Sequence, residues 1–165
     1  MKTFTIALSL LSLIQAGALF GFFYAWVCST MWGLDATDPR VAIQAMQAMN
    51  ASVRNAVFAP VFFGTPVVLG LTALVLYRTG DAAAGLWFAL ATGVIGVLAV
   101  GLTIAVNVPM NEALARIDVP SDLDAARDVW LAYSPDWQFW NQVRTVTSGI
   151  GLLMVGTGIM QIKAD

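Results

Sequence analysis

Polar side chains recur one helical turn apart where a long apolar stretch ends, in "TIAVNVPMN" (103–111). Thr103, Asn107 and Asn111 are spaced by four residues, which stacks side chains on one face of a helix. Amide N–H groups donate hydrogen bonds, and a hydroxyl can donate or accept. In apolar surroundings these groups can bind the oxygen atoms of a small molecule.

A second polar face is predicted in "WQFWNQVRTVTS" (137–148). Trp137, Asn141, Arg144 and Ser148 follow spacings of four, three and four residues, which fit one helical face. A guanidinium beside amide donors can stabilise a phenolate or an enolate, as preorganised donors stabilise an oxyanion. Aromatic walls with a few donors and one cation therefore suit a flat, lipophilic molecule that carries carbonyl or phenol oxygens.

Arg144 needs a partner, because a charge at the centre of a bilayer costs about 2.5–3.5 kcal/mol. The candidates are Glu112, the amides of Asn107 and Asn111, the backbone carbonyls freed by Pro109, and the face of Trp140. Two simpler alternatives stay open. Arg144 could extend to water while Trp140 anchors the helix, and the asparagines could be interhelical hydrogen-bond contacts worth about 0.6 kcal/mol each.

The composition is that of an integral membrane protein, with 59% hydrophobic and 11% charged residues. Apolar runs near or above the ~20 residues needed to cross a bilayer predict spans at about 4–28, 55–77, 82–108 and 140–162. We expect one all-α transmembrane domain, 1–165, folded as a four-helix bundle. The first run resembles a signal peptide, but its apolarity continues to Cys28, so a retained span is favoured over cleavage.

The same composition excludes several classes of function. A net charge of −2 offers no basic surface for nucleic acid. With no histidine and one cysteine, neither an intramolecular disulfide nor a histidine-ligated metal centre is expected. We therefore predict no metal, and we expect the lipid bilayer and a lipophilic small molecule to be the partners.

Two connections on one side of the membrane should be helical. The segment 40–57 places Ile43, Met46, Met49 and Val53 at helical spacing, which predicts an interfacial amphipathic helix between spans one and two. The loop between spans three and four contains two short helical patterns split by Pro120, with Ser121 or Asp122 as N-cap of the second. Asn50 would approach the two polar faces from the first connection.

The pair Asn107-Val-Pro-Met-Asn111 and Trp137-x-x-Trp140-Asn141-x-x-Arg144 resembles the anthrone oxygenase-like family of small four-helix membrane proteins. Most bacterial members of that family carry only a domain-of-unknown-function label. The resemblance extends from the glycine-bearing first span through "AMQAMN" (45–50) to the last helix. It implies a multi-pass protein of a bacterial cell membrane, and a cofactor-independent monooxygenase that oxidises anthrones to anthraquinones with molecular oxygen.

Site roles follow from that resemblance and from chemical plausibility. The expected catalytic residues are Arg144, which would stabilise the reacting anion, and Asn107 and Asn111, which would orient substrate oxygens. The expected substrate-binding residues are Asn141, Trp137, Trp140, Asn50 and Thr103.

The alternative function is non-enzymatic: a protein that binds lipid or a small molecule, or a partner subunit of a complex. Small residues recur every four positions at Gly17, Gly21 and Ala25 and again at Gly85, Ala89 and Gly93. Such stripes allow close helix packing. Packing within the bundle is favoured, and homo-oligomer contacts are the alternative.

Overall fold

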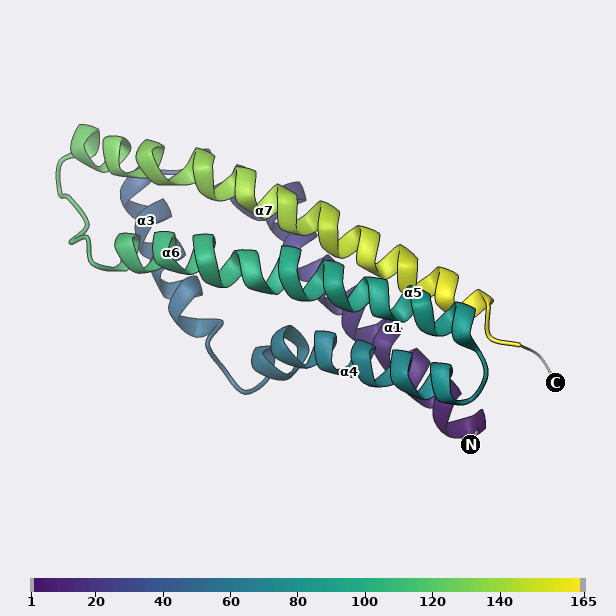
Figure 1. Cartoon of the computed structure of the whole chain (residues 1–165). Helices are drawn as coiled ribbons and strands as arrows, with labels where there is room; N and C mark the ends of the chain where they lie inside the picture. The colour runs from purple at the N-terminus through teal and green to yellow at the C-terminus, as the bar shows by residue number, and fades with distance from the viewer. Residues whose placement is uncertain (1, 164–165) are drawn as a thin grey trace.

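The computed structural model describes residues 2–163, and every regular element in that range is a helix (Figure 1). Four helices are long and apolar enough to cross a membrane: Lys2–Asp35, Phe58–Arg78, Ala82–Ala115 and Leu123–Met160. The predicted four-helix membrane bundle is therefore confirmed.

The first and third of these helices contain π-helical stretches, and the second and fourth are α-helical throughout. The elements are α1 (Lys2–Ala25), η1 (Trp26–Thr30), α2 (Met31–Asp35), α3 (Pro39–Ser52), α4 (Phe58–Arg78), α5 (Ala82–Gly93), η2 (Val94–Gly101), η3 (Thr103–Asn107), α6 (Val108–Ala115) and α7 (Leu123–Met160).

The long helices pack as a ring in which α1 contacts α4 and α7, and α5 contacts the same two helices. The described ends of the chain lie together at one end of this ring (Figure 1). There the backbone N–H of Lys163 donates to the Asp81 carboxylate over 3.2 Å, which joins the last described residues to the turn between α4 and α5. Gly80 allows that turn because it adopts a φ of +94°.

Close helix approaches occur at glycines, but only in part at the predicted stripes. A Cβ at Gly85 would lie 3.1 Å from the Ala73 carbonyl oxygen, whereas one at Gly21 or Gly93 would meet nothing within 4 Å. A Cβ at Gly151 would lie 2.5 Å from Ile95. Glycine is thus required for packing at Gly85 and on α7, and the stripes at Gly21 and Gly93 leave open space.

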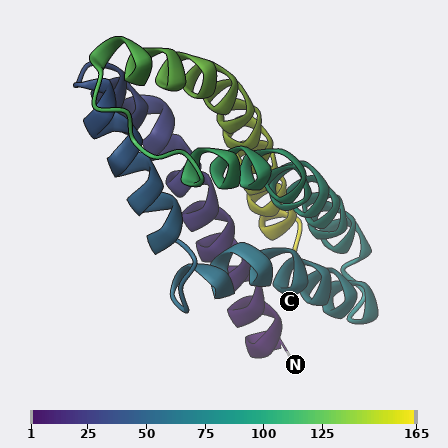
Figure 2. The same ribbon diagram turned by 90° about the vertical axis from the view of Figure 1, so that its left-hand side faces the viewer.

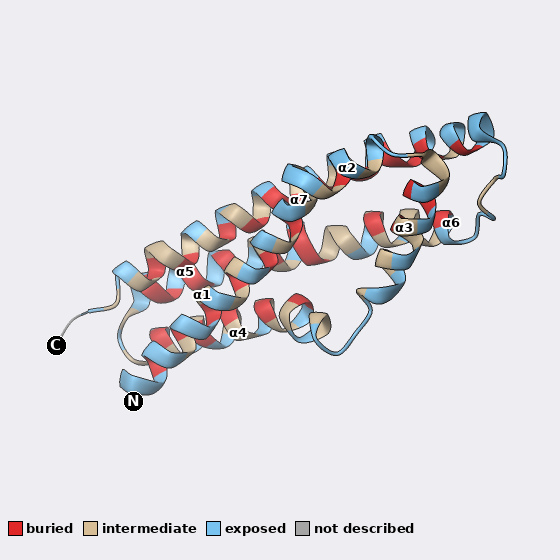
Figure 3. Ribbon diagram, turned by 180° about the vertical axis from the view of Figure 1, so that it is seen from behind, coloured by how far each residue is buried: buried red, intermediate tan, exposed pale blue. Residues whose placement is uncertain are grey.

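Exposed residues follow the outward faces of the bundle (Figure 3), and many of them are large and apolar. Ile14, Val67 and Leu153 are 68%, 60% and 72% exposed. Such extensive apolar exposure is unfavourable in water and favourable against lipid tails. The burial pattern therefore agrees with contact between these faces and a bilayer.

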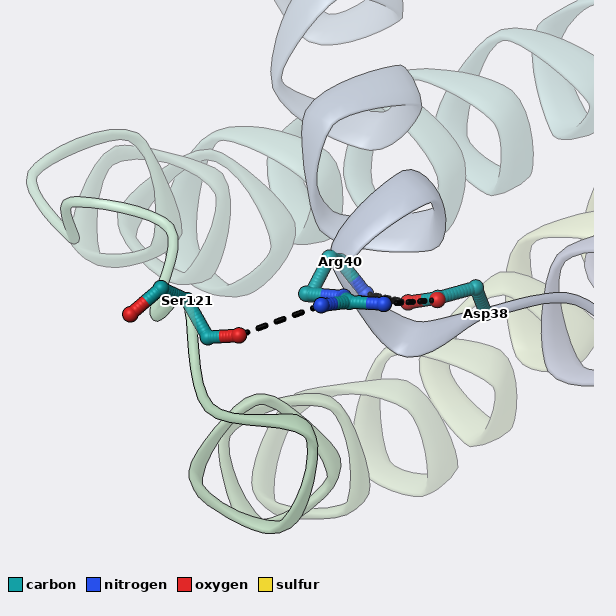
Figure 4. A network of polar contacts seen from close by, with 3 residues as sticks. All are labelled: Asp38, Arg40 and Ser121. Atoms are coloured by element: carbon teal, nitrogen blue, oxygen red, sulfur yellow. Dashed lines mark hydrogen bonds and ion pairs between the residues drawn. The ribbon is translucent and has the colours of Figure 1, made fainter.

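The helix predicted between spans one and two is confirmed as α3, which lies at the end of the bundle opposite the termini (Figures 1 and 2). Ala42, Ile43 and Met46 are fully buried against α7 and α6. Asp38 caps α3 by accepting from the Arg40 backbone N–H over 2.9 Å. The Arg40 guanidinium pairs with Asp38 at 2.6 Å and donates to the Ser121 carbonyl oxygen at 3.1 Å (Figure 4).

The last helix differs from the predicted layout. Asp122 does cap a helix, accepting from the Ala125 backbone N–H over 2.9 Å, but that helix continues without a break to Met160. Pro135 lies inside it and is exposed. Proline leaves the carbonyl of the residue four positions earlier without its helical donor. That residue, Leu131, is also exposed, so surrounding polar groups can satisfy its carbonyl and the helix persists.

Candidate functional site

A cavity of about 560 Å³ opens where α3, η1 and the start of α4 meet η3, α6 and α7. Its walls are mainly apolar and aromatic, with amide and hydroxyl groups at a few points and two arginines. Its lining residues are Phe22, Phe23, Trp26, Met49, Asn50, Val53, Arg54, Asn55, Ala56, Phe58, Ala59, Phe62, Phe63, Thr103, Val108, Asn111, Trp137, Asn141 and Arg144. The size and the sparse polar groups are typical of a small-molecule site.

Arg144 lies in the wall of this cavity and is only 4% exposed. Its guanidinium donates from Nη2 to Asn141 Oδ1 over 2.8 Å and from Nη1 to Thr103 Oγ1 over 3.2 Å. The rings of Phe23 and Trp137 lie 4.7 and 5.3 Å from its Cζ atom. Two neutral hydrogen-bond acceptors and two π-faces thus hold the cation.

No carboxylate neutralises this charge among residues 2–163. Glu112, the acidic partner that the sequence suggested, pairs instead with Arg54 at 3.3 Å, and the cavity lining contains two arginines and no acid. The Arg144–Glu112 and Arg144–Trp140 contacts that were candidates from the sequence are not formed. A buried cation without a counterion attracts an anion strongly, because the low local dielectric weakens screening.

Asn141 holds Arg144 in place from one turn earlier on α7. It is 1% exposed, and its Nδ2 donates to the backbone carbonyl oxygen of Phe23 over 3.1 Å. The same side chain therefore connects α7 to α1 and orients the guanidinium. Asn141 was expected to bind substrate; in the structure its amide contacts Arg144 and the backbone of α1.

Asn111 is the centre of a second network. Its Oδ1 accepts from the Tyr133 hydroxyl and from Trp137 Nε1, both over 2.8 Å. Its Nδ2 donates to Asn50 Oδ1 over 3.0 Å. The Asn111 oxygen is thus occupied by two donors, so this side chain supports α3 and α7 and has little capacity left to bind a ligand.

Unpaired polar atoms gather at the site. Across residues 2–163, five buried side-chain nitrogen or oxygen atoms lack a partner, and four of them belong to Asn50, Asn107 and Arg144. They comprise three donors, Asn50 Nδ2, Asn107 Nδ2 and Arg144 Nε, and one acceptor, Asn107 Oδ1. Leaving such a group unpaired costs about 1–3 kcal/mol. Asn50 and Arg144 line the cavity, so a molecule with acceptor oxygens would complement their two unpaired donors.

Most of the predicted site residues are brought together. Asn50, Thr103, Asn111, Trp137, Asn141 and Arg144 all line the cavity. Asn107 is completely buried but is not among the lining residues. Trp140 is half-buried and outside the lining, with its ring 5.2 Å from that of Phe139.

Asn107 lies at the end of the π-helical stretch η3, where the Val108 N–H bonds to the Thr103 carbonyl five residues back. Thr103 and Asn111 line the cavity, while Asn107 between them is completely buried and outside the lining.

Several contributors were missed in the sequence. Phe23 provides a ring and a carbonyl to the Arg144 site, and no local pattern in the first span marks it. Tyr133 could have been found, because Trp130, Tyr133, Trp137 and Asn141 continue the face of Arg144 backward at spacings of three and four.

Asp35 was also missed, although it helps to position this face. Its Oδ1 accepts from Trp130 Nε1 and Ser134 Oγ, and its Oδ2 accepts from Gln138 Nε2, each over 2.8 Å. The three donors lie four residues apart along α7, so the last residue of α2 is fixed against one face of that helix.

The anthrone oxygenase family model matches residues 54–154. The chain belongs to the anthrone oxygenase family. The matched range contains Arg54, Thr103, Asn111, Trp137, Asn141 and Arg144, so it includes much of the cavity wall.

The aromatic residues of α1 and η1, and Asn50 on α3, come from segments before the family match begins. The resemblance noted in the sequence was broader, since it included the first span and residues 45–50. No curated protein and no solved structure matches the chain.

Proposed function

We propose that this anthrone oxygenase family member is a membrane-embedded, cofactor-independent monooxygenase of a bacterial cell membrane. Its substrate is a lipophilic anthrone or a related phenolic, quinone-like molecule, and its oxidant is molecular oxygen. The observation that supports this most directly is Arg144, a buried cation without a carboxylate partner among residues 2–163. It lies in the wall of an apolar cavity that is large enough for a polycyclic ligand.

The reaction requires a stabilised carbanion. Loss of a proton from the methylene carbon of an anthrone leaves an anion whose charge is delocalised onto the carbonyl oxygen. That oxygen would lie against Arg144, whose Nε–H has no partner within residues 2–163. Charge that develops near a preorganised donor in a dry site is stabilised without reorganisation, and one such donor is worth about 2.7–4 kcal/mol.

Oxygen then completes the conversion. The anion passes an electron to dioxygen, and a bond forms between the methylene carbon and oxygen. The resulting peroxide anion takes up one proton, which balances the proton lost from the methylene carbon, and the hydroperoxide loses water to give the second carbonyl. Anthrone plus dioxygen yields anthraquinone plus water, with one atom of the dioxygen in each product. The substrate supplies both electron pairs, so the residues of the site bind, orient and stabilise charge.

Oxygen uptake and quinone formation in lipid nanodiscs test this proposal. With an anthrone substrate, wild type should exceed empty nanodiscs, and Arg144→Gln should lower the rate at least about tenfold, equivalent to ~1.4 kcal/mol of barrier. Arg127→Gln is the matched control, because Arg127 lies at the exposed start of α7 and pairs with Asp124. Wild-type rates equal to empty nanodiscs across anthrones and hydroquinones would rule out the oxygenase proposal.

A non-enzymatic role is the second candidate, favoured by the Asn111 network, whose bonds to Tyr133, Trp137 and Asn50 are internal. In that case the cavity binds a lipid or small molecule without converting it, or the protein serves as a subunit of a complex. Mass spectrometry of the purified protein distinguishes these outcomes. An unreacted lipophilic ligand, or a stoichiometric partner lost in the Arg144→Gln variant, would favour this candidate over catalysis.

A further inference from the structure

A second hollow of about 450 Å³ adjoins the cavity that contains Arg144. The two share six lining residues: Phe22, Trp26, Met49, Val53, Asn55 and Phe58. Beyond these, the second hollow extends along α1 and α4, past Ala18, Leu19 and Val61. The two spaces are therefore neighbours on either side of a common wall.

Three of the six shared residues are aromatic: Phe22, Trp26 and Phe58. The rings of Phe22 and Phe58 lie 4.8 Å apart between centroids, and Phe58 also stacks on Phe62 at 5.2 Å. Phe22 and Phe58 are half-buried, and Phe58 is the first residue of α4 after the connection from α3. A rotamer change of these rings would join the spaces without moving a helix, and such changes are fast for partly exposed side chains.

The second hollow differs from the first in chemistry. Its polar residues are already used locally. Ser52 donates to the Met49 carbonyl oxygen, and Asn55 donates to the Ser52 carbonyl oxygen and accepts from the N–H groups of Val57 and Phe58. The rest of the lining is apolar. This space therefore has little to offer an oxygenated group and much to offer a hydrocarbon chain.

We propose that the ligand has two parts: an oxygenated aromatic ring against Arg144, and an alkyl or prenyl chain that passes the Phe22–Phe58 pair into the second hollow. This rests on the proposed function for the ring site and adds the substrate class. The apolar chain belongs to the same molecule, because the two spaces share a wall. Of the buried unpaired donors in residues 2–163, Asn50 Nδ2 and Arg144 Nε belong to residues that line the ring cavity, and none belongs to a residue that lines the second hollow.

Binding of two inert quinones tests the chain site. Anthraquinone and 2-octylanthraquinone would be titrated into nanodiscs at equal bilayer mole fractions, with quenching of the cavity tryptophans Trp26 and Trp137 as the signal. In wild type the octyl compound should bind about fivefold more tightly, equivalent to about 1 kcal/mol. Because both quinones are compared at the same mole fraction in the bilayer, their different partitioning from water into lipid does not contribute. The difference in affinity therefore reports packing of the octyl chain in the protein.

Variants that fill the hollow provide the decisive comparison. Ala18→Phe on α1 and Val61→Phe on α4 should each abolish the octyl preference and leave anthraquinone affinity within about twofold. Val67→Phe is the matched control, because Val67 is 60% exposed on the outer face of α4, and it should retain the preference. Equal wild-type affinities, or a preference that survives both filled variants, would overturn the proposal.

The result is separable from catalysis. Both quinones are already oxidised, so their binding does not depend on oxygenase activity. An octyl preference together with no oxygen uptake would support the chain site and contradict the oxygenase. Oxygen uptake with no octyl preference would support the oxygenase and contradict the chain site.

Discussion

Arg144 donates a 2.8 Å hydrogen bond to Asn141 one helical turn earlier on α7, and this contact fixes the direction of a buried cation. Asn141 is held in turn by the Phe23 carbonyl oxygen of α1. The guanidinium is thus placed by two helices that are distant in sequence.

Substitution of Asn141 should disturb the position of the Arg144 guanidinium more than it weakens substrate binding. In Asn141→Leu, Arg144 loses one of its two acceptors and the Phe23 carbonyl loses the Asn141 side-chain donor, while the volume is nearly conserved. We expect kcat for anthrone oxidation to fall about tenfold, equivalent to ~1.4 kcal/mol, with KM changed less than threefold. Asn141→Gln should recover part of the rate, since it retains the amide. Equal kcat in Asn141→Leu and wild type would contradict this role.

Asn107 and Asn111 should respond in opposite ways to the same change. Asn111→Leu leaves the Tyr133 hydroxyl and the Trp137 N–H unpaired. The free energy of unfolding, measured by thermal unfolding, should therefore fall by about 1–3 kcal/mol. Asn107→Leu removes an amide with no partner in residues 2–163, so stability should stay unchanged or rise. If Asn107 orients the substrate, its variant should lose activity without losing stability. A large destabilisation by Asn107→Leu would show that its amide is already satisfied.

The pH dependence of the rate should follow the substrate. The cavity lining contains no Asp, Glu or His, so ionisation of the anthrone itself limits the supply of anion. The rate should rise with pH up to the pKa of the bound substrate and then level off. An electron-withdrawing substituent lowers the pKa of the substrate, so the pH–rate profile should shift to lower pH. Stopped-flow measurement of the oxidation rate checks this. A bell-shaped profile that is identical for both substrates would instead indicate a protein base.

The contact between Asp38 and Arg40 at the start of α3 should persist at mildly acidic pH. Hydrogen bonds from the Arg40 side chain and backbone lower the pKa of Asp38 to about 2, below the roughly 3.9 of an unfolded chain. The stabilisation is therefore complete above about pH 4 and is lost as the pH falls through about 2. Hydrogen exchange in residues 39–43 should thus show the same protection from pH 5 to pH 8, after correction for the intrinsic rate.

Two variants separate the ion pair of Asp38 from its cap. Asp38→Ala removes both the ion pair with Arg40 and the N-cap of α3, so it should raise exchange in residues 39–43. Asp38→Asn retains a capping oxygen and should have a smaller effect. Asp124→Asn, which removes the exposed pair with Arg127 on α7, is the control. A protection change between pH 5 and pH 8 would contradict the assignment.

Much of the fold was predictable because the bilayer imposes strong local rules. Apolar runs long enough to span it must become helices whose backbone bonds are internal, so four spans could be read from composition alone. The same holds for α3, where Ile43 and Met46 follow the helical period, and for the Asp122 cap. Each of these features depends on residues within a few positions of one another.

The site was predictable only where spacing along a regular helix decides it. The face that carries Trp137, Asn141 and Arg144 is such a case, because α7 is α-helical throughout. Asn107 keeps the spacing of four from Thr103 and Asn111, yet it is completely buried and outside the cavity lining, unlike both of them. The local sequence therefore determined which residues are polar, but not which of them line the cavity.

The partners of Arg144 were decided by tertiary structure. Trp140, four residues away, was a candidate from the sequence, yet the rings that lie against the guanidinium belong to Trp137 and to Phe23 on α1. A contact across 121 residues depends on how two helices rotate and pack, which is a property of the whole bundle. The sequence by itself determined four spans and a costly arginine, and only packing placed that arginine in an aromatic cavity without a carboxylate partner among residues 2–163.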